Sequence, residues 1–164
     1  MFKKTLFIIF ILYHTAYANV NINSVIKLQD NVPNECGLQF LVDNDSTSFD
    51  TKLSIKKLKS NETVTFFSVK SEKKISKAEL TTSFGKINEM INVKNQSKTN
   101  YIIVGKTNVD SMTFFFQDLL INGGQLHINK KTYQIKGPID SKVRLEYLFC
   151  TGEMFLPNYN KKNE

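Results

Sequence analysis

The sequence predicts an all-β domain, an antiparallel β-sandwich of the immunoglobulin-like or a related type, with a small β-barrel as the alternative. Three observations support this prediction. Short runs of β-branched and aromatic residues recur along the chain, polar breaks separate them at nearly regular intervals, and no convincing long helical pattern interrupts the series. With 164 residues, 41% of them apolar, the chain has the size and composition of a single globular domain.

Outside the segment 71–93, residues 19–104 contain four predicted strands, at residues 37–43, 52–58, 62–70 and 101–104. In the second of these, Leu53 and Ile55 point to one side and lysines to the other, which is typical of a half-buried strand. The third carries apolar side chains on both faces, as in a strand covered on both sides. The fourth is a short apolar run of the kind found in buried strands.

The C-terminal half contains five predicted strands, at residues 112–116, 119–121, 125–129, 132–136 and 142–149. The third and fourth form a hairpin whose turn is Asn129-Lys130. The fifth alternates apolar and charged residues. Cys150 points to the face opposite the apolar residues, so either a bulge turns it inward or both faces of the strand are covered at that end.

The segment 71–93 allows two interpretations. Leu80, Phe84, Ile87 and Ile91 have the spacing of one amphipathic helix, whereas Thr81, Thr82 and Gly85 disfavour a helix. We therefore expect two short strands, at residues 78–83 and 87–93.

Residues 1–18 read as a cleaved signal peptide. Lys3 and Lys4 precede a short uncharged apolar run, and Ala16-Tyr17-Ala18 fits cleavage after Ala18. The run is too short for a membrane-spanning helix. We expect export to the periplasm or the extracellular space, a single β domain over residues 19–157, and a flexible polar tail over residues 158–164.

The basic charge is a weak guide to partners. Loss of Lys3 and Lys4 leaves 20 of the 22 basic residues against 15 acidic ones, a net charge of +5. Only Arg144 is an arginine, and nucleic-acid sites usually draw on arginine. We therefore expect no nucleic acid as a partner, and only a weak case for anionic lipid or polysaccharide.

The two cysteines predict one disulfide. Cys36 and Cys150 are an even pair in a chain expected to leave the reducing cytosol. Closing so long a loop would stabilise the domain by up to about 4.7 kcal/mol. A nucleophilic cysteine paired with His127 is the disfavoured alternative, because no orienting acid lies near His127 in the sequence.

No metal or cofactor site is expected. Two cysteines and one histidine in the mature chain do not complete a four-ligand zinc site without a carboxylate. Asp43-Asn44-Asp45 begins like a calcium loop, but Ser48 stands where the motif needs glycine and Ser54 where it needs glutamate. The phosphate-binding, dinucleotide-binding and serine-hydrolase motifs are also missing from the sequence, so no catalytic residue is assigned.

The function favoured by these observations is a non-enzymatic exported module that binds a protein or an envelope component. Phe115, in the run of three phenylalanines, becomes a candidate contact residue if it is exposed. Lys56, Lys57, Lys73 and Lys74 are candidates for steering acidic partners.

Two other functions remain open. A hydrolase of envelope polymers would need two carboxylates paired in a cleft. The available carboxylates are Asp110, Asp118, Asp140, Glu146 and Glu153. A lipocalin-like carrier of small molecules would need a barrel that encloses an apolar cavity.

Overall fold

The computed structural model describes residues 19–44, 47–60, 62–90, 94–96, 100–106 and 109–155. Its strands are β1 (Asn19–Gln29), β2 (Val32–Asn44), β3 (Thr47–Lys57), β4 (Thr63–Lys70), β5 (Ala78–Thr81), β6 (Lys94–Gln96), β7 (Asn100–Lys106), β8 (Gly123–Ile128) and β9 (Lys131–Lys136). Its helices are α1 (Ile87–Met90), α2 (Val109–Asn122) and α3 (Ser141–Phe155). Within these ranges, no helix combines the length and the hydropathy needed to cross a membrane.

The larger sheet has six strands in the order β1-β2-β3-β4-β7-β6, and all its neighbours are antiparallel. The β1–β2 hairpin turns at Asp30 and Asn31, whose φ angles of 53° and 63° suit the two-residue turn that matches the twist of antiparallel strands. The strands β1 to β4 follow one another as a meander, which places β1 at one edge of the sheet.

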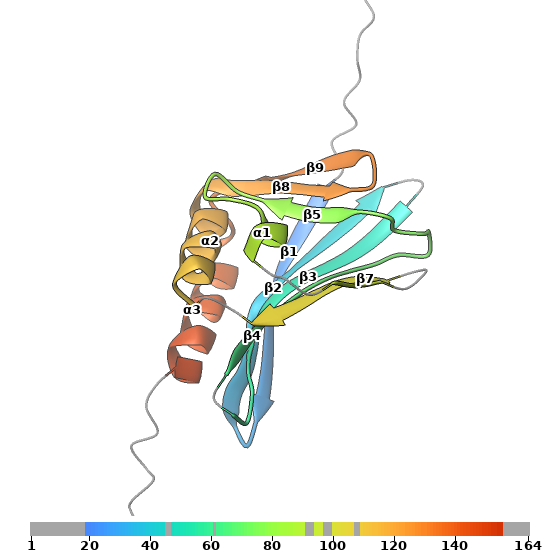
Figure 1. Cartoon of the computed structure of the whole chain (residues 1–164). Helices are drawn as coiled ribbons and strands as arrows, with labels where there is room; N and C mark the ends of the chain where they lie inside the picture. Colours follow the sequence, from blue (N-terminus) through green and yellow to red (C-terminus); the bar gives the residue numbers. More distant parts are fainter. Residues whose placement is uncertain are drawn as a thin grey trace, which may run out of the picture.

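The second layer combines the smaller sheet with two helices. This sheet has the order β5-β8-β9 and is also antiparallel. Figure 1 shows the smaller sheet at one end of the molecule, with α2 and α3 packed side by side next to it. Helix α3 lies against β1 and β2 of the larger sheet.

One hydrophobic core joins the two layers. The larger sheet contributes alternate residues of its central strands, among them Leu38, Phe40, Leu53, Ile55, Phe67 and Ile103. The second layer contributes Leu80, Leu126, Ile128, Phe115, Phe116, Leu119, Val143 and Tyr147. The alternation in β2 to β4 therefore directs one face of the larger sheet into the core.

The predicted fold class is confirmed: the chain is mostly β, and two antiparallel sheets form a sandwich-like arrangement with few helices. In the described part of the chain the strands form two separate sheets, not one closed barrel. Strands are found at six predicted places: 37–43, 52–58, 62–70, 101–104, 125–129 and 132–136. The hairpin turn is at Asn129-Lys130, with a φ of 55° at Asn129.

Three of the C-terminal strand predictions are wrong. Residues 112–116 and 119–121 belong to α2, and residues 142–149 belong to α3. Tertiary packing explains the difference, because both helices bury one face in the core and expose apolar residues on the other. With apolar residues on both sides, the sequence no longer shows a clear period of 3.6 residues, and every second residue can be apolar, as in a strand.

The uncertain segment 71–93 is part strand and part helix. Ala78–Thr81 is β5, in agreement with the first predicted strand, whereas Ile87–Met90 is the short helix α1, so the second predicted strand is wrong there. Residues 91–93 lie outside the described residues, as do the predicted signal peptide 1–18 and the predicted tail 158–164.

Candidate functional site

Helix α3 is apolar on two opposite sides. Its inner side carries four buried residues: Val143, Tyr147, Cys150 and Met154. On its outer side, Leu145 and Leu148 are 53% exposed and Phe149 is 68% exposed. These three residues lie at positions i, i+3 and i+4, which is the spacing of one continuous helical stripe.

Helix α2 repeats this arrangement beside α3. Its inner side carries Met112, Phe115, Phe116, Leu119 and Leu120, all buried. Its outer side exposes Phe114 and Ile121. The two helices are held together by stacked rings of Phe116 and Tyr147, whose centroids are 4.6 Å apart. Burial raises the pKa of Tyr147, so its phenol stays neutral in this contact.

Asp118 fixes the loop that precedes α1 against α2. Its Oδ1 accepts a hydrogen bond from Asn122 Nδ2 at 2.7 Å. Its Oδ2 accepts from Ser83 Oγ at 2.7 Å and from the backbone N–H of Phe84 at 2.8 Å. The bonds from Asn122 and Ser83 lower the pKa of Asp118 most, because they favour the charged carboxylate. The same loop places the ring of Phe84 5.9 Å from that of Phe114.

We call the exposed apolar surface of this region the helical face. It consists of seven large side chains that are each at least 40% exposed: Phe84, Phe114, Ile121, Leu145, Leu148, Phe149 and Phe155. Their exposed areas add up to on the order of 700 Å². Large apolar side chains that are exposed together on neighbouring elements mark interaction sites more often than singly scattered ones do.

A pocket of about 300 Å³ lies between α2 and α3 within this face. Its apolar walls are Leu120, Ile121, Leu145 and Leu148. Three polar residues also line it: Gln117, Ser141 and Arg144. The Nε of Arg144 is buried and has no hydrogen-bond acceptor among the described residues. The pocket therefore combines an apolar interior with one cationic group that lacks a partner at Nε.

Acidic groups outnumber basic ones around the helical face. No basic residue lies on α2, which carries Asp110 and Asp118. Helix α3 carries Lys142 and Arg144 against Glu146 and Glu153, and Asp140 precedes it. Glu146 accepts a hydrogen bond from Ser24 of β1 and lies 3.9 Å from Lys142 Nζ. Lys142 is the only lysine on these two helices, and Lys57 and Lys86 adjoin the region from other elements.

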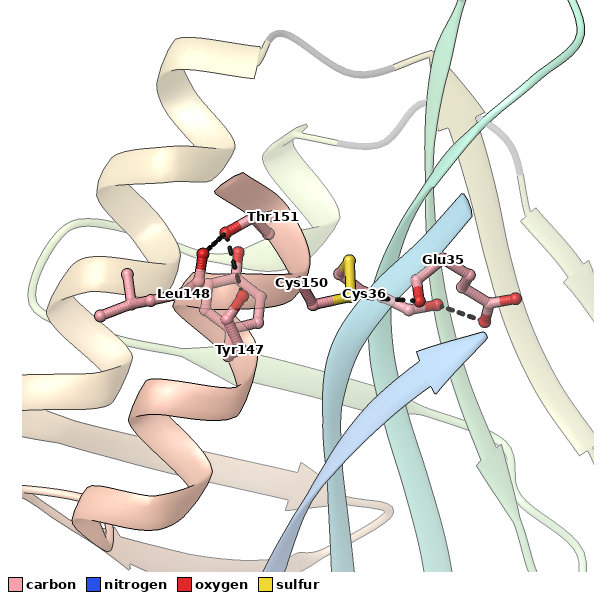
Figure 2. Close-up of a disulfide and its surroundings, with 7 residues drawn as sticks. Glu35, Cys36, Tyr147, Leu148, Cys150 and Thr151 are labelled. Carbon is pink, nitrogen blue, oxygen red and sulfur yellow. Dashed lines mark hydrogen bonds between the residues drawn. A yellow bond between two sulfur atoms is a disulfide. The ribbon is translucent and has the colours of Figure 1, made fainter. Parts of the chain in front are cut away.

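A buried disulfide fixes α3 to the larger sheet. Cys36 of β2 and Cys150 of α3 are bonded, with Cα atoms 5.8 Å apart, and they pack with Met154. Figure 2 shows Cys150 directed at β2 and Leu148 on the side of α3 away from that strand. Cys150 Sγ lies 3.7 Å from the Glu35 carbonyl oxygen. The predicted disulfide is thus present, and it joins the larger sheet to a helix.

The Glu35 carboxylate supports the same region from inside the sheet. It accepts hydrogen bonds from Lys27 Nζ at 2.7 Å and from Ser54 Oγ at 2.9 Å. Because the Glu35 residue is only 9% exposed, these partners offset the cost of burying its charge. Lys57 Nζ donates to the Met154 carbonyl oxygen at 3.2 Å, near the C-terminus of α3, where a cation is favourable.

The predicted contact residues are not brought together. Phe115 is fully buried, so the exposure that its contact role required is absent; its neighbour Phe114 is 56% exposed instead. Lys56 and Lys57 are half-buried on β3, whereas Lys73 and Lys74 are exposed in the loop between β4 and β5. Lys56, Lys73 and Lys74 lie on other elements than α2 and α3, whereas Lys57 contacts the C-terminal end of α3 through Met154.

His127 lies in β8 and contacts two threonines. Its Nε2 is 3.2 Å from Thr81 Oγ1, and its Nδ1 is 2.9 Å from Thr132 Oγ1. Cys36 and Cys150 are both in the disulfide, so the disfavoured cysteine–histidine pairing does not form. No group of three or more metal-ligating side chains is found in the described ranges. Asp43 is exposed, and Asp45 lies outside those ranges.

Three of the five candidate carboxylates have separate structural partners. Asp118 binds the loop around Ser83, and Glu146 binds Ser24. Asp140 accepts from the backbone N–H of Lys142 at 2.8 Å, which makes it the N-cap of α3.

Sequence reasoning missed the helical face and Arg144. Two signals were present. Leu145, Leu148 and Phe149 have helical spacing, and the parity of Cys150 agrees with a helix that also buries Val143 and Tyr147. Arg144 is the only arginine in the chain, which marks it among many lysines. Comparisons with protein-family models, with curated proteins and with solved structures returned no match.

Proposed function

We propose that this protein is an exported, non-enzymatic domain that binds a protein partner through the helical face. The observation that carries the proposal is the exposed apolar surface of α2 and α3. Seven large apolar side chains in one region are costly to leave in water. Binding to a partner would remove these side chains from contact with water.

The size of the helical face suits a protein partner. Its apolar area, on the order of 700 Å², is close to the roughly 800 Å² that each side contributes to a standard protein–protein interface. A small ligand would leave most of this area exposed. The pocket at its centre is the kind of depression that receives an anchoring side chain.

The charges around the helical face favour a protein over an anionic membrane. Asp110, Asp118, Asp140, Glu146 and Glu153 lie on or next to the two helices, against Lys142 and Arg144 on α3, Lys57 beside Met154 and Lys86 after Phe84. An anionic lipid surface would be repelled by such a rim. Most lysines, which would attract anionic polymers, lie on strands and loops and not on α2 or α3.

One feature of the structure supports export, together with the signal peptide expected from the sequence. The buried disulfide between Cys36 and Cys150 is compatible with an oxidising compartment outside the cytosol. Periplasmic or extracellular location is therefore part of the proposal.

The non-enzymatic part of the proposal is supported by the roles of the carboxylates. A glycosidase-like mechanism would use two carboxylates that flank one substrate bond. Asp118, Asp140 and Glu146 instead hold a loop, a helix start and the edge strand β1.

A site-specific photo-crosslinking experiment tests the proposal in the cells that make the protein. A photoreactive amino acid replaces Leu148 in one variant and Leu28 in the control. Leu28 is a matched control because it is 59% exposed against 53% for Leu148, but it lies on the β1–β2 hairpin. We expect one discrete protein adduct from position 148 and none from position 28.

A second substitution makes the result specific to the helical face. Adding Leu145→Asp to the Leu148 variant should abolish the adduct, because a charge next to the pocket opposes apolar docking. The thermal unfolding midpoint should stay within a few degrees, since Leu145 is half exposed. Equal adducts from positions 148 and 28, or no adduct from either, would overturn the proposal.

A further inference from the structure

We infer that the pocket between α2 and α3 receives an apolar side chain of the protein partner that has a carboxylate beside it, and that Arg144 binds this carboxylate. The inference rests on the proposed function and adds the chemistry of the partner's anchor. It comes from the pocket's composition, not from the size of the helical face.

Arg144 has the chemistry to bind a carboxylate. A guanidinium has five N–H donors in a fixed planar arrangement, and a carboxylate can accept two of them at once. The Nε of Arg144 is buried without an acceptor in the described part of the chain, and a buried unpaired donor is unfavourable. A carboxylate in the pocket, which Arg144 lines, would pair with the charge of its guanidinium.

The nearby acids already have other partners. Asp140 Oδ1 accepts from the backbone N–H groups of Lys142 at 2.8 Å and Val143 at 3.4 Å. Glu146 is engaged by Ser24 and lies close to Lys142. Neither acid forms an ion pair with Arg144 within 4.0 Å among the described residues. The cation is therefore available to a carboxylate from outside.

The apolar walls of the pocket suit an apolar side chain of the partner. Four aliphatic side chains surround a space of about 300 Å³, which is at the small end of the range for ligand sites. This space suits one side chain and its adjoining carboxylate better than an extended ligand. An apolar surrounding also strengthens an arginine–carboxylate pair, because water competes less for it.

The only arginine of the chain makes the inference testable by NMR. Its Nε–Hε group gives one side-chain signal that needs no assignment, because no second arginine exists. The probe is N-acetyl-L-phenylalanine, and its matched control is N-acetyl-L-phenylalaninamide, which lacks only the charged carboxylate. The titration is done on the mature chain with its disulfide intact, at about pH 6, where the probe's carboxylate is ionised.

We expect the Arg144 signal to shift and saturate with the carboxylate probe at a Kd of about 1 mM, as suits so small a ligand. The amide should bind about tenfold more weakly, because it cannot form the charge-assisted pair. Acetate, which has no apolar group, should also bind more weakly. In an Arg144→Met variant the backbone amides of Leu145 and Leu148 should respond equally to both phenylalanine probes.

Equal affinity for the acid and the amide, or an Arg144 signal that does not move with either, would overturn the inference. These outcomes leave the proposed function intact if the adduct at position 148 still forms. Loss of that adduct together with a normal carboxylate titration would have the opposite meaning, because it would reject protein docking and keep the carboxylate site.

Discussion

Asp118 shows how one half-buried carboxylate organises part of the helical face. Its two oxygens accept from Asn122 within α2 and from the loop that carries Ser83 and Phe84. This contact holds the ring of Phe84 against Phe114. The position of two of the seven exposed side chains therefore depends on one ionised group.

Replacing Asp118 by asparagine should reduce stability by about 1 kcal/mol at neutral pH, because charge-assisted hydrogen bonds are lost. The folded-state pKa of Asp118 is lowered, so its stabilisation is fully present above the unfolded value of about 3.9 and is lost as the pH falls through the lowered folded-state pKa. Urea unfolding should therefore show a larger difference between the two proteins at pH 7 than near pH 2. The same difference at both values would contradict the ionised role.

Two glycines should respond in opposite ways to alanine. At Gly37 of β2, an added Cβ would collide with the Leu53 carbonyl oxygen and with Ser54 of the neighbouring strand. Gly37→Ala should therefore destabilise the domain by about 1–3 kcal/mol.

At Gly152 of α3, an added Cβ meets no atom within 4 Å. Gly152→Ala should stabilise the domain by up to about 1 kcal/mol, because alanine favours the helix. Urea midpoints measured side by side check both substitutions, and a stabilising Gly37→Ala would contradict the close approach of β2 and β3.

The position of helix α3 depends on the disulfide. The bond spans 114 residues and joins the helix to β2 near its C-terminal end. The Cys36→Ala, Cys150→Ala double variant should lose about 2–4 kcal/mol of stability. Amide hydrogen exchange should accelerate more at α3 than at β3, because β3 keeps strand partners on both sides. Uniform acceleration across the molecule would argue against a local role of the bond.

The same helix shows where sequence reasoning succeeds and where it fails. Strands such as β3 are predictable because one face is buried and the other faces solvent. The alternation of apolar and polar residues therefore indicates a strand directly. In α3, Val143 and Tyr147 are buried while Leu145 and Phe149 are exposed apolar residues. The local sequence pattern alone predicts a strand at residues 142–149. Only the packing of α3 against the larger sheet shows that these residues form a helix.

The site was less predictable than the fold for the same reason. The disulfide followed from two cysteines and expected export, without any spatial information. The helical face required knowing which side of each helix the core covers. Phe115 and Phe114 are neighbours in the sequence, yet one is fully buried and the other is more than half exposed.

At the scale of the whole molecule, charge and apolar surface are separated. The helical face is apolar with an acidic rim, whereas most lysines lie on the strands and loops of the remaining surface. Such an arrangement would orient an approaching partner and would disfavour docking of anionic polymers on the helices. Raising the ionic strength should therefore change the rate of partner association more than the stability of the bound state.

Every part of this account depends on a chain that leaves the cytosol and closes the bond between Cys36 and Cys150. Intact-mass spectrometry of the protein isolated from its cells, before and after reduction, tests this directly. The account predicts a polypeptide that starts at Asn19 and gains two hydrogen atoms on reduction. A protein that keeps residues 1–18, or whose mass does not change on reduction, would contradict it.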